Sequence, residues 1–211
     1  QIIKGCGCDY FVSQKISWND TNKFPYHTFY WQGIDGSKVL CHFPPEDGYN
    51  SPMSVKSLCY GENNYNEITI NNEFISLYGM GDGGGGPSAE YVERALRMHN
   101  FEGAPKVKFG RADEFFERAS KYDNYPKWVG ELYLELHRGT LTTQAKNKLF
   151  NRKFEQKLVE LENLYTRLPL KDYPDNVLNE LWKTLLINQF HDILPGSSIH
   201  EVYEDTKEDY Q

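Results

Sequence analysis

The sequence has few cysteines and lacks any long hydrophobic run. Four cysteines among 211 residues are too sparse for a disulfide scaffold and favour a reduced, cytoplasmic setting. No stretch of about 18 apolar residues occurs, which excludes a transmembrane helix. The first residues, QIIKGCGCDY, also lack the apolar core of a secretory signal. Because the chain starts at Gln1 without Met, in what reads as a strand, we expect it to belong to a longer polypeptide.

Positive charge is also scarce, since 23 Lys and Arg stand against 30 Asp and Glu, for a net charge of −7. An acidic chain is a poor partner for nucleic acid or for an anionic membrane, so we expect neither. Neutral sugars are not disfavoured by this charge. The hydrophobic content of 39% and the charged content of 25% are ordinary for a globular protein and exclude disordered and fibrous classes.

Residues 1–124 combine strand-like and helix-like segments. Short apolar runs separated by Gly and Pro predict strands, and apolar residues at helical spacing after Ser88 predict a helix. The succession of the two types predicts a β/α architecture. The expected strands are 11–18, 37–43 and 73–80 with a short one at the start of 105–119, and the expected helices are part of 56–68, 88–100 and the rest of 105–119.

From about Tyr125 the pattern becomes helical. One apolar stripe runs through Phe150, Phe154, Leu158, Leu161 and Tyr165, which is typical of a helix that packs on neighbours. A second helix is expected over 177–190, and Ser198 with Glu201 is a capping-box signature for a last one. We therefore predict an α/β part over residues 1–124 and an all-α part, a three-helix bundle, over residues 125–211.

The glycine-rich segment 79–88, GMGDGGGGPS, is the first candidate site. Gly79, Gly81 and Gly84, and also Gly81, Gly83 and Gly86, match G-x-G-x-x-G, so a nucleotide-binding module using the Gly79–Gly86 loop is one alternative. Asp82 would repel a pyrophosphate, and Pro87 removes a backbone donor. A structural glycine turn is a second alternative. The third, which we favour, is a loop that lets backbone approach a ligand while Asp82 projects into a site.

The second candidate is NQFHDILPGS (188–197), in which His191 precedes Asp192 at the end of an apolar helix. Adjacent helical residues point about 100° apart, but a helix break before Pro195 would let both face one cleft. The competing interpretation is a histidine that interacts with the helix dipole beside a solvated aspartate. Spacing alone favours that interpretation.

Five segments together carry a family resemblance. They read FVSQKISWN (11–19), FPYHTFYWQGIDGSKVLCHFPPEDGYNS (24–51), LYGMGDGGGGPS (77–88), WVGELYLELHRGTLTTQAKNK (128–148) and LWKTLLINQFHDILPGSS (181–198). In this order they resemble glycoside hydrolase family 38 α-mannosidases, most closely the cytosolic or vacuolar branch. The resemblance implies the later part of a seven-stranded-barrel-like β/α catalytic domain followed by a three-helix middle domain.

The resemblance also implies a chemistry and residue roles. Such enzymes hydrolyse terminal α-mannosides of oligosaccharides with retention and hold one divalent cation, usually zinc. His191 would be a metal ligand, Asp192 would bind the sugar, and Asp82 would be the general acid/base. The nucleophilic aspartate and two further ligands belong upstream of Gln1, so we expect this chain alone to be inactive and to function with the rest of its parent polypeptide.

Further sugar-binding residues follow from the same resemblance. Tyr49 falls where the family has a stacking tyrosine, and Asn50 where it has an aspartate, which weakens any charge-assisted hydrogen bond to the sugar. Lys15 occupies a position that is arginine in other branches. Without the family, packing for Tyr49 and a solvated charge for Lys15 would be preferred. His137 and Trp31 are weaker candidates for the same cleft.

Two other function classes remain as alternatives to the mannosidase. One is the nucleotide-binding module, and the other is a non-catalytic helical interaction domain resting on residues 125–211. The sequence leaves linkage preference, the native metal and the oligomeric state open, a homo-oligomer included.

Overall fold

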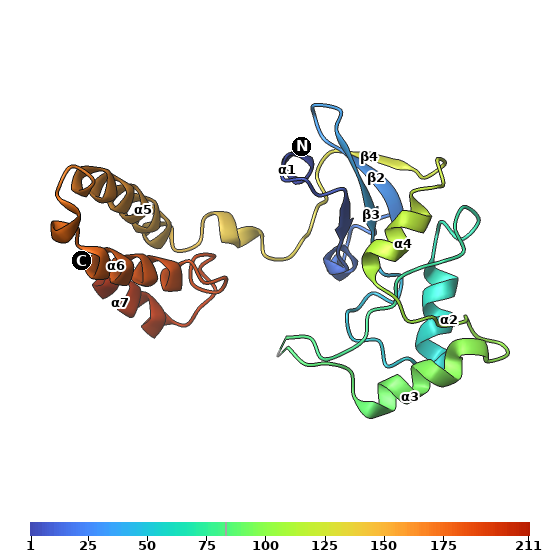
Figure 1. Cartoon of the computed structure of the whole chain (residues 1–211). Coiled ribbons are helices and arrows are strands. Elements are labelled where there is room, and N and C mark those ends of the chain that lie inside the picture. The colour runs from blue at the N-terminus through green and yellow to red at the C-terminus, as the bar shows by residue number, and fades with distance from the viewer. Residues whose placement is uncertain (83) are drawn as a thin grey trace. The chain divides into compact units, whose positions relative to one another are not determined.

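The computed structural model describes residues 1–82 and 84–211 (Figure 1). Gly83, one of the glycines in the expected G-x-G-x-x-G, lies outside the described residues. The chain separates into two compact units, residues 1–136 and 137–211. This partition lies C-terminal to the division after residue 124 that the sequence suggested.

A four-stranded mixed sheet forms the centre of the first unit, in the order β1-β3-β2-β4. β1 runs parallel to β3, β3 pairs antiparallel with β2, and β2 runs parallel to β4. The hairpin register places Phe29 opposite Cys41. The strands are β1 (Tyr10–Val12), β2 (Thr28–Gln32), β3 (Lys38–His42) and β4 (Lys127–Val129).

Successive side chains of each strand point to opposite faces of the sheet, and each face packs against a hydrophobic core. On one face Phe29, Val39 and Cys41 form a core together with Ile16 and Phe43. On the other face Leu40 packs against helix α4 (Ala112–Ala119). The aromatic rings of Tyr10 and Phe116 stack there, with centroids 4.6 Å apart.

Three more helices complete the first unit: α1 (Ile2–Gly5), α2 (Val55–Asn64) and α3 (Ala89–Arg97). Met53, Leu58, Ala95 and Met98 form a separate core between α2 and α3. Ser88 caps α3 as expected, since its hydroxyl accepts a hydrogen bond from the Tyr91 amide at 3.3 Å.

Several expected strands of this unit are wrong. The chain begins with helix α1 rather than a strand, and segment 11–18 is a strand only at its start, because Lys15–Trp18 form a 3₁₀ helix. Segment 73–80 has only an isolated bridge between Met80 and Gly85, and residues 105–110 form no strand. The helical part does not start at 125, because β4 follows first. Strands β2 and β4 were not expected from the sequence.

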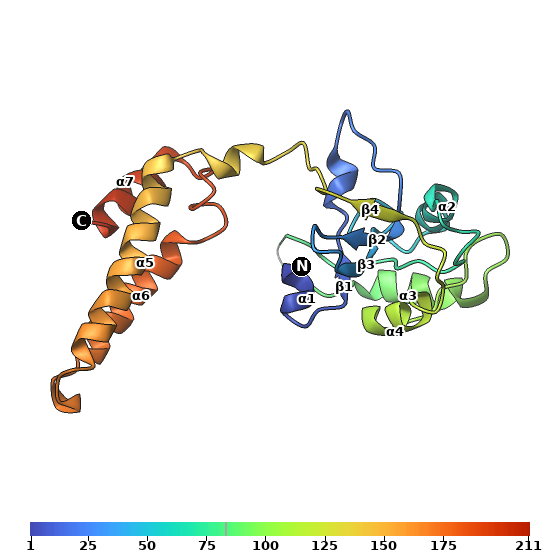
Figure 2. The ribbon, with the colours of Figure 1, turned by 90° about the horizontal axis from the view of Figure 1, so that it is seen from above.

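The second unit consists mainly of α5 (Ala145–Tyr165), α6 (Asp175–Asn188) and α7 (His200–Asp209). Helices α5 and α6 run side by side (Figure 2). Their shared core contains Leu158, Leu178 and Leu185, and the expected stripe residues Phe154, Leu161 and Tyr165 pack against it. Phe150 instead lies near the surface and stacks on Tyr210.

The start of α7 differs from the expectation. Ile199 is its N-cap and contributes no side-chain hydrogen bond, so the capping box of Ser198 with Glu201 is wrong. The Ser198 hydroxyl donates instead to the Asp192 carbonyl at 2.7 Å. Ser198 therefore fastens the preceding turn rather than the helix.

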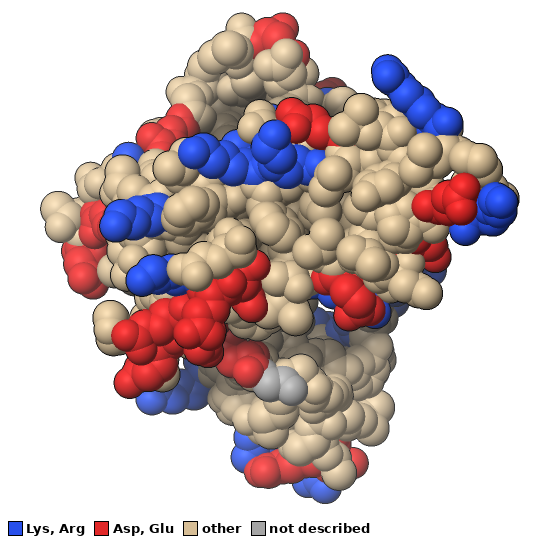
Figure 3. Space-filling view, turned by 90° about the vertical axis from the view of Figure 1, so that its left-hand side faces the viewer, with Lys and Arg blue, Asp and Glu red and all other residues tan. Residues whose placement is uncertain are grey.

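The fold as described is mixed α/β, and the seven-stranded barrel and three-helix bundle stay predictions. Within the described residues, no helix is both long and apolar enough to cross a membrane. The face shown in Figure 3 carries patches of acidic and of basic side chains, so neither sign of charge covers it continuously.

Candidate active site

Lys15 and Tyr49, two of the predicted sugar-binding residues, lie near each other in the first unit. Lys15 opens the 3₁₀ helix after β1, and its ammonium nitrogen lies 3.4 Å from the centroid of the Trp18 ring and 5.7 Å from that of Tyr49. The Tyr49 hydroxyl accepts a hydrogen bond from the Gln14 amide at 3.2 Å. Lys15 is half-buried between aromatic rings, so it is more than a solvated edge charge.

The loop that carries Tyr49 is fastened by a carboxylate at its base. Glu46 accepts hydrogen bonds from the hydroxyls of Ser51, at 2.7 Å, and of Ser76. The Ser51 amide donates to the Leu77 carbonyl at 2.8 Å. These bonds join the loop to the segment that leads into the glycine-rich turn.

Asn50 connects this loop directly to the glycine-rich turn. Its side-chain oxygen Oδ1 accepts a hydrogen bond from the Gly81 amide at 2.7 Å. A Cβ atom on Gly81 would lie 2.9 Å from that oxygen, so only glycine permits the approach. The structure thus brings Tyr49 and Asn50 next to the residue that precedes Asp82.

Asp82 lies near the tip of a narrow turn that Met80 and Gly85 close with two backbone hydrogen bonds of 3.0 and 2.9 Å. Its side chain is exposed and its φ is +57°, a left-handed conformation that is uncommon outside glycine. No other side chain of the described residues is hydrogen-bonded to its carboxyl group. A free carboxyl on a turn tethered beside Tyr49 is available for proton transfer to a ligand.

The same turn weakens the nucleotide-binding alternative. A dinucleotide fingerprint needs a strand before the glycines and a helix directly after them. Helix α3 begins only at Ala89, and residues 73–79 form no strand. The backbone therefore does not form the strand-turn-helix unit that would direct amides at a pyrophosphate.

His191 and Asp192 lie in the second unit, on the turn that follows α6. Their atoms Nε2 and Oδ2 are 3.8 Å apart, and the side chains are 80% and 61% exposed. Helix α6 already ends at Asn188, so the angular separation of adjacent helical residues does not apply to them. The His191 ring contacts Phe190, with centroids 4.3 Å apart.

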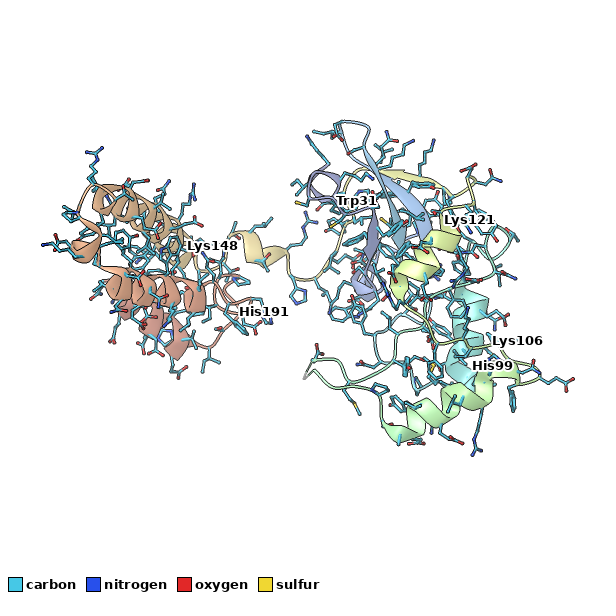
Figure 4. All side chains as sticks on the ribbon, viewed as in Figure 1. Trp31, His99, Lys106, Lys121, Lys148 and His191 are labelled. Atoms are coloured by element: carbon cyan, nitrogen blue, oxygen red, sulfur yellow. The ribbon has the colours of Figure 1, made fainter. Side chains whose placement is uncertain are left out.

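Two helices hold this turn from either side. Lys148 and Asn147 of α5 donate to the carbonyls of Leu194 and Ile193, at 2.8 and 3.3 Å. From α7, the Tyr203 hydroxyl lies 3.3 Å from the Asp192 carbonyl oxygen and 3.2 Å from that of Ile193. Figure 4 shows Lys148 and His191 at the same end of this unit.

Asn147, Lys148 and Tyr203 were not expected at this site. Asn147 and Lys148 reach the turn from 46 residues away in the chain, and the Tyr203 contacts cross from α7 back to the turn over 10 and 11 residues. Pro195-Gly196 was the one local signal of a tight approach. Gly196 has φ +95°, and a Cβ there would lie 2.8 Å from Thr143. The turn that carries His191 and Asp192 is therefore held in a defined conformation and is not a frayed helix end.

The pair can supply part of a metal site. A neutral imidazole and a carboxylate are both ordinary zinc ligands, and the short distance between Nε2 and Oδ2 lets both reach one ion. Across residues 1–82 and 84–211, no group of three or more His, Cys, Asp or Glu side chains is placed to hold a metal. His191 thus fits the role of a ligand, with Asp192 within reach of the same place, and further ligands are needed to complete a metal site.

The two weaker candidates have other surroundings. The Trp31 ring belongs to the core of the sheet, and its Nε1 donates to the Gly130 carbonyl at 2.7 Å. These contacts favour packing for Trp31. His137 precedes a 3₁₀ helix (Arg138–Leu141) and adopts φ +64°. The candidate residues divide between the two units. The first unit holds Lys15, Tyr49, Asn50 and Asp82, and the second holds His137, His191 and Asp192.

Comparison with known proteins gives the same assignment along the whole chain. The chain is 47% identical over 208 residues to Alpha-mannosidase G of Dictyostelium discoideum, which covers 97% of this chain and 19% of that protein. It is 42% identical over 216 residues to human Alpha-mannosidase 2C1, which covers 100% of this chain and 21% of that protein. The chain therefore spans about a fifth of the length of these relatives.

The fold also resembles a solved structure, that of an alpha-mannosidase from Enterococcus faecalis V583. The TM-score is 0.61 at 18% identity, over 88% of this chain and 23% of that one. The model of the glycosyl hydrolases family 38 N-terminal domain matches residues 1–131, and that of the alpha mannosidase middle domain matches residues 135–211. The chain belongs to glycosyl hydrolase family 38.

Proposed function

We propose that this chain is part of a metal-dependent, retaining α-mannosidase that removes terminal α-mannosyl residues from oligosaccharides. The observation that carries the proposal is the hydrogen bond between Asn50 and Gly81, because it joins the loop of Tyr49 to the turn of Asp82. An aromatic ring, an amide and a cationic side chain beside a free carboxyl form a suitable surface for a neutral sugar.

In this mechanism Asp82 is the general acid/base. It first protonates the oxygen of the departing group and then removes a proton from the attacking water. The Tyr49 ring packs on the sugar, and the Asn50 amide and the Lys15 ammonium bind its hydroxyls. The nucleophilic carboxylate of a retaining enzyme would come from another part of the parent polypeptide.

His191 would be one ligand of a divalent cation, most simply zinc, which when bound fixes the sugar through its vicinal hydroxyls, and Asp192 beside it would bind the sugar. The chain's own contribution is to keep the imidazole and the carboxylate oriented, through the contacts from α5 and α7 to the turn. The cytoplasmic location expected from the cysteine content stays a prediction.

Asp82→Asn in the whole protein tests the acid/base role. We expect turnover to fall strongly, by about 10²-fold or more, on mannosides with poor leaving groups, since these need protonation. Activated aryl mannosides should lose much less. Asp172→Asn, a change at another exposed aspartate, is the matched control. Equal losses on both classes of substrate would refute the role of Asp82.

His191→Ala tests the metal site through metal content rather than activity. We expect the whole protein to lose most of its bound zinc, measured by elemental analysis, because one of few ligands is gone. His200→Ala is the control, since His200 is similarly exposed in the same unit. Unchanged zinc in His191→Ala would leave His191 as a turn residue only.

A further inference from the structure

The carboxylate of Glu46 is half-buried at the base of a loop of the first unit, and the proposed mechanism does not use it. Its two oxygens accept hydrogen bonds from two different serines. Oε1 accepts from the Ser51 hydroxyl at 2.7 Å, and Oε2 accepts from the Ser76 hydroxyl. Ser51 belongs to the loop of residues 44–53, whereas Ser76 belongs to the segment of residues 73–80 that leads into the glycine-rich turn. One side chain therefore clamps two segments from different parts of the chain.

The direction of these bonds requires a group that accepts through two oxygens. The Ser51 hydroxyl oxygen itself accepts a hydrogen bond from the Met53 amide at 3.3 Å, so its one proton points to Glu46. A carboxylate accepts through both of its oxygens, whereas the amide of a glutamine accepts through one atom and donates through the other. Glu46 is therefore suited to hold the two serines at a fixed separation.

Helix α2 forms a rigid seat for this clamp. Gly61 approaches the Glu46 side chain so closely that a Cβ there would lie 2.9 Å from its Cγ. The Asn64 side chain donates a hydrogen bond to the Pro45 carbonyl at 2.8 Å. Because Gly61 and Asn64 are three residues apart, they lie on one face of the helix. This face holds the backbone and the side chain at the base of the loop.

The loop has an unusual backbone on either side of its sugar-binding candidates. Asp47 has φ +57° and Met53 has φ +52°, and Tyr49 and Asn50 lie between them. Non-glycine residues keep such left-handed conformations where the surrounding structure imposes them. The loop therefore depends on contacts outside its own sequence preferences, and Glu46 makes such a contact.

Two backbone amides connect the clamp with the turn of Asp82. The Ser51 amide donates to the Leu77 carbonyl at 2.8 Å. The side chain of Asn50, the preceding residue, accepts from the Gly81 amide at 2.7 Å. A displacement of Ser51 would therefore disturb the turn through both bonds.

We propose that Glu46 is a positioning residue of the mannosidase site, which fixes the loop of Tyr49 and Asn50 relative to the turn of Asp82. The inference rests on the proposed function, in which the loop binds the sugar and the turn carries the general acid/base. Glu46 acts through Ser51 and Ser76. A small misplacement of binding and proton-transfer groups relative to each other lowers the rate of the chemical step, so the clamp contributes to catalysis without contact to the substrate.

The first part of the test uses the 211-residue chain and needs no activity. Glu46→Ala should raise the hydrogen-exchange rate of the Gly81 amide about threefold, measured by NMR, because the turn loses part of its support. Glu46→Gln should restore most of the protection, since it keeps the shape and one acceptor oxygen, and a serine hydroxyl can rotate to accept from its NH₂ group. Glu62→Ala, at an exposed glutamate of α2, is the matched control. An unchanged Gly81 rate in folded Glu46→Ala would overturn the proposal.

Ser76→Ala tests whether Glu46 acts through this serine. It should raise the Gly81 exchange rate in the same direction as Glu46→Ala. The double variant should exchange no faster than Glu46→Ala alone, because both changes break the same bond. Multiplied effects would show that the two residues act independently and would contradict the clamp. Thermal unfolding checks each variant, and Ser76→Ala alone decides the matter where Glu46→Ala does not fold.

The second part of the test measures turnover of the whole protein. Glu46→Ala should lower kcat about tenfold on mannosides with poor leaving groups and on activated aryl mannosides alike, because sugar and acid are both displaced. Glu46→Gln should recover most of this loss. A residue with a merely structural role would lower the melting temperature and leave kcat of the folded enzyme unchanged. That result would refute the positioning role.

Failure of this inference and failure of the mannosidase proposal give different results. If the whole protein hydrolyses mannosides through Asp82 but Glu46→Ala has normal kcat, only the role of Glu46 is wrong. If Gly81 exchange responds to Glu46→Ala as expected while the whole protein hydrolyses no mannoside, the clamp on the turn stands and the proposed function is wrong.

Discussion

The side-chain oxygen of Asn50 and the backbone amide of Gly81 are joined by a hydrogen bond of 2.7 Å, although 31 residues separate them. The bond uses the oxygen of the amide, and the Asn50 NH₂ group donates to no other residue among 1–82 and 84–211, so it can donate to a ligand. An aspartate at position 50 would accept the same bond but would have no donor. In the proposed function, Asn50 therefore combines a positioning role for the turn of Asp82 with a contact to the sugar.

The first prediction concerns this bond. Asn50→Ala should free the Gly81 amide, and its hydrogen-exchange rate should rise about fivefold, because a net hydrogen bond contributes about 1 kcal/mol. The rate is measured by NMR on the 211-residue chain. Asn63→Ala, at an exposed asparagine on α2, is the matched control. The same Gly81 exchange rate in both variants would show that Asn50 does not hold the turn.

The second prediction concerns the pH dependence of the loop of residues 20–22, whose backbone amides donate hydrogen bonds to the Glu135 carboxylate. Backbone hydrogen bonds, first that from Thr21, lower the pKa of the Glu135 carboxyl. A carboxyl whose pKa is lower in the folded state stabilises the fold above its unfolded pKa, and this contribution is lost as the pH falls through the lowered value. Glu135→Gln should therefore lower the melting temperature near neutral pH and have a smaller effect in acid.

The measurement is thermal unfolding by circular dichroism between neutral and acidic pH. Glu102→Gln, at an exposed glutamate of the same unit, removes an equal charge without removing these bonds. A difference between Glu135→Gln and wild type that is the same at every pH would rule out the carboxylate as the cause.

The third prediction concerns His42, the last residue of strand β3, which is completely buried. Its Nε2 accepts a hydrogen bond from the Ile75 amide at 3.1 Å, so Nδ1 carries the proton and donates to the Thr28 hydroxyl at 2.9 Å. Burial, and secondarily the charge of His27, lowers the pKa of His42 to about 3. His42 should thus stay neutral throughout mildly acidic pH.

Because the unfolded chain binds a proton near pH 6.5 and the folded chain does not, stability falls as the pH drops from about 6.5 toward 3. The slope from this one group approaches 1.4 kcal/mol per pH unit. The imidazole nitrogens report the tautomer directly by ¹⁵N NMR, with exposed His200 as the internal control. A His42 ring that becomes protonated in mildly acidic solution would contradict the prediction.

The sequence predicted the elements whose signals are local. Strand β3 and helices α3, α5 and α6 each have their own periodicity, and Ser88 even makes the capping bond expected of it. Strand β4 has only three residues and is formed by pairing with β2, far away in the chain. Segment 73–80 has the residue types of a strand, but apart from the bridge of Met80 with Gly85 it pairs with no other described segment. The strand expected from its composition therefore does not form.

The candidate site shows the same division. Lys15, Tyr49 and His191 pointed to a site only through the family resemblance, because spacing alone favoured structural roles for them. The glycine-rich segment already suggested from its residues that Asp82 projects into a site. The contacts that position these residues come from Gln14, Asn50, Lys148 and Tyr203. These contacts mostly join segments far apart in the chain, and no local pattern marks their partners in advance.

The last prediction concerns the support of the His191–Asp192 turn. The Tyr203 hydroxyl accepts a hydrogen bond from the Ser198 amide at 3.0 Å and can donate to the carbonyls of Asp192 or Ile193. Tyr203→Phe removes all of these bonds while keeping the ring, so we expect the unfolding free energy to fall by about 1 kcal/mol. The Ser198 amide should exchange several-fold faster, and the His191 resonances should shift. Tyr173→Phe, in the same unit, removes a hydroxyl that has no hydrogen-bond partner in the described part of the chain. If the two variants affect Ser198 exchange equally, α7 does not hold the turn, and the orientation of His191 and Asp192 must then come from Asn147 and Lys148 of α5.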